Sequence, residues 1–298
     1  MGIRSYTWLL LSLSALSLVS LTSCKEELKK EIATPHHWYD SIHSFSIALQ
    51  NQHYEQINDV SSDLIIIDAD DSNLTHEQIQ RIKGSGKKIY SYLSIGEAEN
   101  YRSYWKKSWK RKHPPFLDKE NPEWKGNFKV RYWDKEWQDI IFKRLQELVD
   151  LGYDGVYLDI IDAFEYYEQK GRKEAAQEMV DFVSLISKHA KQANPDFKII
   201  PQNGLGLLDN PKYLSHIDGV GKEETWYSFD NRPVPNDTNA WDVGLLNKAY
   251  AAGKMVLLID YPTDHQKQCE FIAKAKEKGF IPYVGNRSLN KFIDVKCK

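Results

Sequence analysis

The chain has 298 residues, of which 41% are hydrophobic and 28% are charged, a globular composition that allows a substantial core. Its formal net charge of −2 does not favour nucleic acid or an anionic membrane surface as a partner. The P-loop, GxGxxG, GxSxG, HxH and HExxH patterns are missing, which removes the usual signals of nucleotide, dinucleotide, serine-hydrolase and common zinc chemistry.

The first 23 residues have the pattern of a secretory signal. Arg4 precedes an apolar run from Trp8 to Val19, which is too short for a confident membrane span. The segment Leu21–Cys24 resembles the bacterial lipobox, which implies a palmitate-bearing lipid on Cys24 and an exported protein anchored to the cell envelope, on its periplasmic face or at the cell surface. The alternative is an ordinary cleaved leader followed by a chance cysteine.

The charged segment 24–37 lacks an apolar period and is predicted to be a solvated tether, so the folded domain is expected over residues 38–298. With Cys24 assigned to lipid, Cys269 and Cys297 remain. An exported protein allows these two thiols to pair, which would tie the C-terminal tail to the last helix, but the sequence leaves this open.

Short β-branched runs alternate with amphipathic helices from Trp38 onward, the pattern of a parallel sheet covered by helices. The predicted strands are Phe45–Leu49, Leu64–Asp68, Lys88–Ile95, Gly155–Asp159, Lys198–Gln202, Asp218–Glu223, Met255–Asp260 and Ile281–Val284. The predicted helices are Thr75–Lys83, with Thr75 and Gln78 as a capping box, Lys135–Leu151, Lys173–Ala193, Asn239–Ala252 and His265–Lys278. Eight such units over this length predict a single-domain (β/α)8 TIM barrel.

A long excursion, Glu97–Asp134, follows the third strand and contains a ninth strand-like run, Phe128–Tyr132. Its aromatic residues are Tyr101, Tyr104, Trp105, Trp109, Phe116, Trp124, Phe128, Tyr132 and Trp133. They could form a hydrophobic plug that holds the insertion on the barrel, or flat faces on which sugar rings stack. A basic nucleic-acid groove is a third alternative, which the mild acidity of the chain disfavours.

Polar groups follow the predicted strands at their carboxyl ends, where barrels place catalytic residues. They include Asp68 with Asp70, Asp159 with Asp162, Gln202-Asn203, Glu223-Glu224 and Asp260-Tyr261. Paired carboxylates without a metal signature fit glycoside hydrolysis, although carboxylates also cap helices. Asp68, Asp70 and Asp71 could alternatively bind a cation for metal-assisted hydrolysis.

Several segments together resemble glycoside hydrolase family 114, a group that includes endo-α-1,4-polygalactosaminidases. These segments are Asp68–Asp70, Lys87–Glu99 with Tyr101 and Trp105, Asp154–Asp159, Gln202–Gly204 and Gly219–Glu223. The likeness runs from about Phe45 to Asn286, and Tyr92–Glu99 is its most distinctive part. It implies a (β/α)8 hydrolase that cuts α-1,4-linked galactosamine or N-acetylgalactosamine polymers with an Asp and a Glu.

Within this resemblance the catalytic Asp matches Asp159, and the Glu matches the end of the sixth strand. Glu223 and Glu224 are both available there. Strand alternation is expected to bring only one of them into the barrel mouth, and Glu223 is preferred. Asp159 would be the nucleophile and Glu223 the general acid/base of a retaining double displacement, with carboxyl groups about 5–5.5 Å apart rather than the roughly 6.5–9.5 Å of an inverting pair.

The residues expected to line sugar subsites are Asp68, Asp70, Tyr92, Glu97, Asn203, Trp226, Asp260 and Tyr261. Their acids suit the ammonium group of a deacetylated amino sugar. No cofactor or metal is expected, and the partners are an amino-sugar polysaccharide and, through Cys24, a membrane; the protein should be a monomer. The alternative function is a carbohydrate-binding lipoprotein that keeps the barrel without turnover.

Overall fold

The computed structural model describes residues 37–297. The predicted signal segment, the lipobox with Cys24 and the tether up to residue 36 lie outside the described residues and stay predictions. Within the described range, none of the helices combines the length and the apolar character that a membrane crossing requires.

All eight predicted barrel strands are present, with bounds that agree to within one residue. They are β1 (Phe45–Ala48), β2 (Leu64–Ile67), β3 (Lys88–Ser94), β7 (Gly155–Asp159), β8 (Lys198–Pro201), β9 (Gly219–Glu223), β10 (Met255–Asp260) and β11 (Ile281–Val284). Most of their residues are buried, as expected for a parallel sheet that is covered on both faces.

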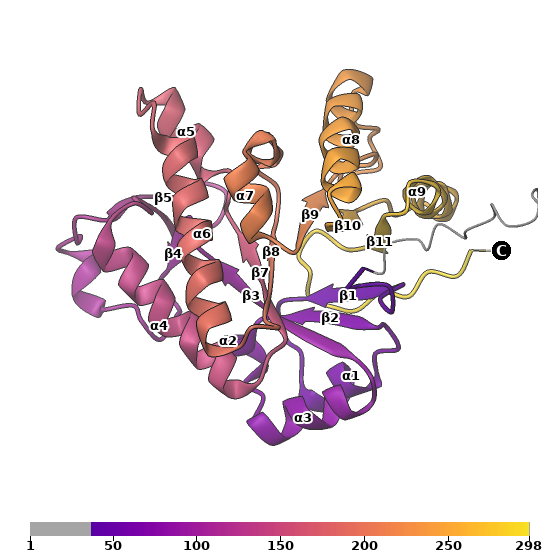
Figure 1. The fold of residues 1–298 in the computed structure, drawn as a ribbon, viewed down its shortest axis with the longest axis horizontal. Helices are drawn as coiled ribbons and strands as arrows, with labels where there is room; N and C mark the ends of the chain where they lie inside the picture. The colour runs from indigo at the N-terminus through magenta and orange to yellow at the C-terminus, as the bar shows by residue number, and fades with distance from the viewer. Residues whose placement is uncertain (1–36, 298) are drawn as a thin grey trace, which may run out of the picture. The chain divides into compact units, whose positions relative to one another are not determined.

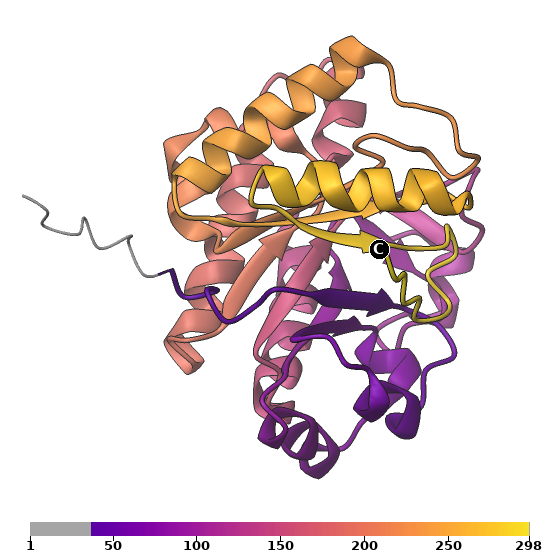
Figure 2. The same ribbon diagram turned by 90° about the vertical axis from the view of Figure 1, so that its right-hand side faces the viewer.

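The strands are parallel and neighbours in space follow their order in sequence. Sheet β1-β2-β3-β7-β8 continues into sheet β9-β10-β11 through a parallel bridge between Gln202 and Gly221. At the other end β11 lies beside β1, where the rings of Phe45 and Tyr283 are 5.5 Å apart. The helices lie outside this sheet (Figures 1 and 2), so the fold is the predicted α/β barrel.

The five predicted helices correspond to α3 (His76–Gly84), α4 (Lys135–Leu151), α6 (Ala175–Ala193), α8 (Asn236–Ala251) and α9 (His265–Glu277). In α3 the capping box of Thr75 and Gln78 is formed as predicted. Helix α4 begins after the N-cap Asp134 and ends at Gly152, whose φ of 93° is the left-handed C-cap conformation. Local sequence signals therefore place these helix ends.

Several shorter helices were not predicted, because four to seven residues are too few to show a helical period. They are α1 (Tyr54–Asp59), α2 (Ala69–Ser72), α5 (Ala163–Gln169) and α7 (Pro211–His216), together with the 3-10 turns η1 (Lys107–Lys110) and η2 (Leu205–Asp209). Helices α2 and α5 and turn η2 begin within a few residues of the ends of β2, β7 and β8, and so border the mouth of the barrel.

The excursion after β3 contains a small antiparallel sheet, β4-β6-β5, made of β4 (Glu97–Glu99), β5 (Leu117–Glu120) and β6 (Asn127–Val130). The strand-like run near Phe128 is thus β6, part of the insertion and not a barrel strand. Trp109 and Phe116 are buried, and the ring of Phe116 lies 5.5 Å from that of Trp137 on α4. Most insertion aromatics therefore form the hydrophobic plug that fastens the insertion to the barrel.

Two aromatic residues of the insertion differ from the rest. Tyr101 and Trp124 are 63% and 45% exposed, and both line a cavity described below. These two residues are therefore not part of the plug, and the stacking of sugar rings on them stays a prediction.

Tyr157 fills the barrel interior next to β9. It is fully buried, and a Cβ atom built on Gly221 would lie only 2.0 Å from its hydroxyl oxygen. The glycine in β9 is therefore required by this close approach, because any side chain would displace the tyrosine.

Cys269 of α9 and Cys297 form a disulfide with a Cα–Cα distance of 5.5 Å, which answers the question that the sequence left open. The C-terminal tail is also held to the barrel by hydrogen bonds. Leu49 N donates to Leu289 O at 2.6 Å, and Ile293 N donates to the hydroxyl of Tyr283 at 3.0 Å. The tail thereby brings Arg287 to the barrel mouth, where it lines the cavities.

Candidate active site

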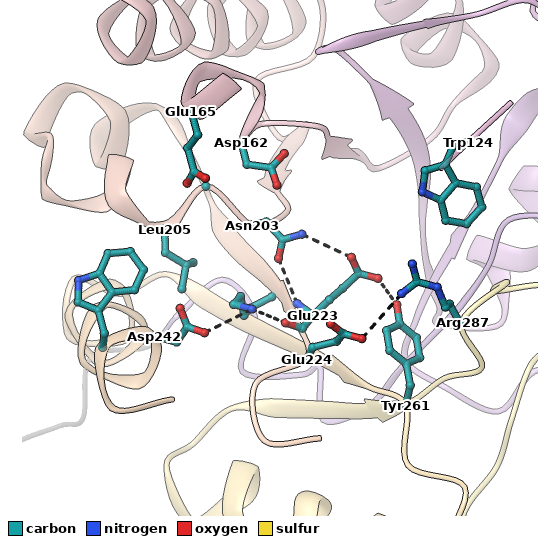
Figure 3. Close-up of a pocket in the computed structure, with 13 residues that line it drawn as sticks. Trp124, Asp162, Glu165, Asn203, Leu205, Glu223, Glu224, Asp242, Tyr261 and Arg287 are labelled. Carbon is teal, nitrogen blue, oxygen red and sulfur yellow. Dashed lines mark hydrogen bonds and ion pairs between the residues drawn. The ribbon is translucent and has the colours of Figure 1, made fainter. Parts of the chain in front are cut away.

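Two adjoining cavities, with volumes of about 780 and about 370 Å³, are lined by residues that follow the carboxyl ends of the barrel strands. They share Trp124, Asp162, Asn203, Glu223 and Arg287. Figure 3 shows Glu223 near the middle of the smaller cavity, with Trp124 on one side and Leu205 and Asp242 on the other. Glu223 therefore stands where the two cavities meet.

Asp159 ends β7 and lines the larger cavity. Its Oδ2 accepts a hydrogen bond of 2.7 Å from the hydroxyl of Tyr92, on the neighbouring strand β3. Burial, followed by the charge of Glu223, raises the pKa of Asp159 to about 8. An acid in this state keeps its proton at neutral pH as long as Glu223 is ionised.

The backbone directly after Asp159 is strained. Ile160 has a φ of 59°, a left-handed conformation that a β-branched residue rarely adopts. Gly96 allows it, since a Cβ on Gly96 would lie 2.2 Å from Ile160 O. Strain of this kind concentrates at functional sites, where surrounding structure maintains it.

Glu223 ends β9 and is surrounded by hydrogen-bond donors. Its Oε1 accepts from the hydroxyl of Tyr261, and its Oε2 accepts from the side-chain amides of Gln202 and, at 3.4 Å, Asn203. Glu223 N donates to Asn203 Oδ1 at 3.2 Å. Burial raises the pKa of Glu223 above its ordinary value, while the donors act in the opposite direction.

Glu224 does not follow the expected alternation. It lies just beyond β9 with a φ of 52°, so its side chain is not directed to the opposite face, and both glutamates line the smaller cavity. The expectation that only one enters the barrel mouth was therefore wrong. Only Glu223 lines both cavities, whereas Glu224 Oε1 accepts from Phe229 N at 3.2 Å and lies 3.9 Å from Arg287.

Asp68 and Asp70 line the larger cavity and are bound by Arg102. The Arg102 guanidinium lies 2.7 Å from Asp68, 3.1 Å from Asp70 and 2.5 Å from Glu99. Burial raises the pKa of Glu99, and Arg102 counteracts this. The positive charge beside Asp68 and Asp70 is thus the guanidinium of Arg102, which belongs to the insertion.

Glu97 is almost completely buried, at 1% exposure, and lines the larger cavity. Its Oε1 accepts from Asn121 Nδ2 at 2.9 Å and lies 3.5 Å from Lys129 Nζ. Its Oε2 has no hydrogen-bond partner within residues 37–297. This oxygen is itself buried, so Glu97 carries an acceptor that the described residues leave unpaired.

Two predicted subsite residues, Trp226 and Asp260, line neither cavity. Asp260 is fully buried and accepts hydrogen bonds of 2.7–2.8 Å from the backbone N–H groups of Thr225, Trp226 and Tyr227. Trp226 packs toward Phe271 of α9, 6.1 Å between ring centroids. Asp260 thus shapes the loop after β9, because it satisfies three backbone donors that have no strand partner. Tyr261, by contrast, lines the smaller cavity.

Sequence reasoning missed several residues of the cavity walls, namely Arg102, Lys222, Trp241, Asp242 and Arg287. Arg102 had no local signal, since a spacing of three residues favours ion pairing on a helix, and Glu99 ends a strand. Arg287 follows the last strand and could have been listed with the other strand-end residues. Trp241 and Asp242 are on α8, which the sequence describes only as a surface helix.

The partly buried Asp159 carboxyl is expected to reduce stability at alkaline pH. Between the ordinary pKa of 3.8 and the folded-state pKa of about 8, the unfolded chain loses this proton and the folded chain keeps it, so the free energy of unfolding falls with rising pH. Asp159→Asn should therefore be more stable than the parent by on the order of 1–2 kcal/mol at pH 8. Urea unfolding at pH 4, 6 and 8 should show that the difference in the free energy of unfolding between variant and parent grows with pH. A parent as stable as the variant at pH 8 would contradict this prediction.

The family model for glycoside-hydrolase family GH114 matches residues 28–297. An uncharacterized protein of Deinococcus radiodurans is 39% identical over 233 residues, 78% of this chain and 75% of the relative. One of Thermotoga maritima is 32% identical over 290 residues, 92% of this chain and 88% of the relative.

Among solved structures, the glycoside hydrolase domain of PelA from Pseudomonas aeruginosa has a TM-score of 0.70 and 20% identity, covering 85% of this chain and 98% of that one. Ega3 of Aspergillus fumigatus, in complex with galactosamine, has a TM-score of 0.67 and 18% identity, covering 85% and 95%. At such identities these likenesses show the fold.

Proposed function

The chain belongs to glycoside-hydrolase family GH114 and is a glycoside hydrolase, and from this premise we propose that it cleaves α-1,4-linked galactosamine or N-acetylgalactosamine polymers by retaining double displacement. Asp159 is the nucleophile and Glu223 the general acid/base. The proposal is supported by the family, by the galactosamine bound in the similar Ega3 structure, and by two partly buried carboxyl groups in one cavity.

The observation that carries the division of roles is the position of Glu223 at the junction of the two cavities. A general acid must reach the glycosidic oxygen, which lies between the sugar that is attacked and the sugar that leaves. Glu223 borders both spaces, whereas Asp159 lines only the larger one. The larger cavity then holds the sugar whose anomeric carbon is attacked.

The two carboxyl groups share one proton in the proposed cycle. Burial raises the pKa of both, so the pair does not ionise fully at neutral pH. With the proton on Glu223, the negative charge that raises the Asp159 pKa is removed, and the Tyr92 hydroxyl stabilises the Asp159 carboxylate. Glu223 then protonates the leaving oxygen while Asp159 attacks, and in the second step Glu223 takes the proton of the attacking water.

The larger cavity also suits an amino sugar. The carboxylate residues Glu97 and Asp162 both border it. A protonated amine is a strong donor to such groups, because a hydrogen bond between charged partners is stronger than one between neutral ones. Exposed Tyr101 and Trp124 offer flat faces at the rim.

Incubation of the purified protein with galactosamine and N-acetylgalactosamine polymers, followed by proton NMR, tests the proposal. The first reducing ends released should have the α configuration and then mutarotate, because two inversions at the anomeric carbon restore it. Initial β product would overturn the retaining mechanism. Glycan binding without any new reducing ends would instead favour a carbohydrate-binding role.

A further inference from the structure

One segment of the insertion, residues 106–113, carries a dense run of positive charge. No acid occurs between Glu99 and Asp118, and five cations lie within seven residues of that stretch. They are Lys106, Lys107, Lys110, Arg111 and Lys112, and His113 follows them. Removing these five charges from the net charge of −2 leaves −7 for the rest of the chain. The net charge therefore does not describe this local basic surface.

The cations of the basic surface are exposed and have no acidic partner. None of the five forms an ion pair with any residue of the range 37–297. Other cations of the insertion do form such pairs, as Arg102 does with Glu99 and Lys129 with Glu97. Like charges held close together repel one another, and an anionic partner would remove this repulsion. The charge pattern thus favours a negatively charged partner.

Aromatic rings hold the basic surface on the folded domain. Trp109 in the 3-10 turn η1 is only 4% exposed, and its ring centroid lies 5.1 Å from that of Trp105 and 5.3 Å from that of Phe116. At the end of the segment, the ring centroid of His113 lies 6.2 Å from that of Phe128. The backbone between the cations is therefore ordered before any partner binds, so binding orders less of the chain than it would in a charged tail.

The shape of the basic surface distinguishes between possible partners. Residues 106–113 line neither of the two cavities described above, so the partner is not held there. The one indole of the segment, Trp109, is buried and offers no face to a nucleobase, and η1 has four residues, too few to enter a DNA groove as a helix. A deacetylated galactosamine polymer is itself cationic and would be repelled. An anionic phospholipid surface requires only exposed positive charge.

We propose that residues 106–113 form a docking surface for the anionic headgroups of a phospholipid membrane. The lysine ammonium groups and the Arg111 guanidinium donate hydrogen bonds to phosphate oxygens. The predicted lipobox indicates an envelope location, and a lipid on Cys24 would act together with this surface, because stable membrane anchoring commonly combines a lipid with a basic patch. The inference does not depend on the proposed function, since none of these residues lines the cavities.

Sedimentation with lipid vesicles tests the proposal. The protein is the chain from Lys25 onward, because the apolar leader and a lipid on Cys24 would bind vesicles by themselves. The compact unit begins at Tyr39, so this chain keeps the whole barrel. It should sediment with vesicles of phosphatidylethanolamine and phosphatidylglycerol but not with vesicles of phosphatidylcholine. Binding should be lost between about 0.1 M and about 1 M NaCl, because the screening length falls from about 10 Å to about 3 Å.

The double variant Lys107→Gln, Lys110→Gln should bind the anionic vesicles at least about tenfold more weakly, because each lysine near such a surface contributes about fivefold to the binding constant. The double variant Lys143→Gln, Lys188→Gln is the matched control. It removes the same charge from exposed lysines of α4 and α6 and should bind as the parent does. All four side chains are exposed, so both variants should fold, which circular dichroism would check.

Three results would overturn the docking surface. The first is no binding to the anionic vesicles, or equal binding to both kinds of vesicle. The second is equal vesicle binding by the Lys107→Gln, Lys110→Gln variant and its control. The third concerns a DNA duplex, the competing anionic partner: if the parent bound DNA as tightly as the anionic vesicles at equal phosphate concentration, and the variant lost that binding, the surface would be assigned to nucleic acid.

Discussion

Asp159→Ala and Glu223→Ala are each expected to lower kcat/KM for a galactosamine polymer by at least about 10³-fold, because each removes a group that acts only in the transition state. Both residues are the last of their strands and their side chains line the cavity instead of the packed core, so the variants should keep the fold, which circular dichroism would check. Steady-state release of reducing ends is the measurement. Variants that fold and cleave the polymer at the parental rate would refute the pair.

Azide distinguishes the two roles. With galactosaminyl fluoride, Glu223→Ala should still form the glycosyl–enzyme ester as fluoride leaves, and azide should then displace Asp159 and give the α-azide. In Asp159→Ala, azide should attack from the vacated side and give the β-azide. The opposite pattern would exchange the assignments of nucleophile and acid/base.

Glu224→Gln is the matched control for Glu223, since the two adjacent side chains line the same cavity. Glu224 does not reach the larger cavity, so the Glu224→Gln variant should lose far less activity than the Glu223→Gln variant. If Glu224→Gln proved the more damaging change, Glu224 would be the general acid.

Arg102→Met is expected to destabilise the fold by about 3–5 kcal/mol, the usual result of removing one member of a buried ion-pair cluster. The side chains of Arg102, Glu99 and Asp68 are only 7%, 4% and 10% exposed. Without the guanidinium, their negative charges stay buried beside each other. Chemical unfolding of parent and variant gives the difference directly.

The cost of Arg102→Met should shrink as pH falls. Burial already raises the pKa of Glu99, and loss of Arg102 removes what lowers it, so in the variant this acid takes up a proton at a higher pH. Arg144→Met is the matched control, because Arg144 contacts only Asp70 in this cluster and otherwise the more exposed Glu147. If Arg102→Met lowered the free energy of unfolding by no more than Arg144→Met does, the buried cluster would contribute little to stability.

The barrel could be predicted because its signals are local. Each strand is a short run of β-branched or aromatic residues, and each long helix has a cap or a glycine at its end, as with Thr75 and Gly152. Since parallel strands end at one edge of the sheet, the strand-end acids Asp159 and Glu223 were expected to meet, and the structure places both in the larger cavity.

Contacts between distant segments could not be predicted in this way. The sequence places Asp260 at a strand end like Asp159, yet Asp260 accepts hydrogen bonds from three backbone donors of the loop after β9 and lines neither of the two cavities. The insertion contains nine aromatic residues whose burial the sequence does not distinguish. Only the fold of the insertion decides that Trp109 is buried while Trp124 is exposed. Burial depends on what packs against a residue, which local periodicity does not report.

The amino-acid sequence by itself determined the barrel, its insertion and the edge at which Asp159 and Glu223 emerge, because hydrophobic period, caps and strand ends are properties of neighbouring residues. Only the tertiary structure decided which glutamate borders both cavities, since the left-handed φ of Glu224 breaks the alternation of the strand. It alone brought Arg102 to the acids after β2 and Trp241 to the cavity beside Glu223. Those contacts join segments distant in sequence, and the packing of the whole barrel sets them.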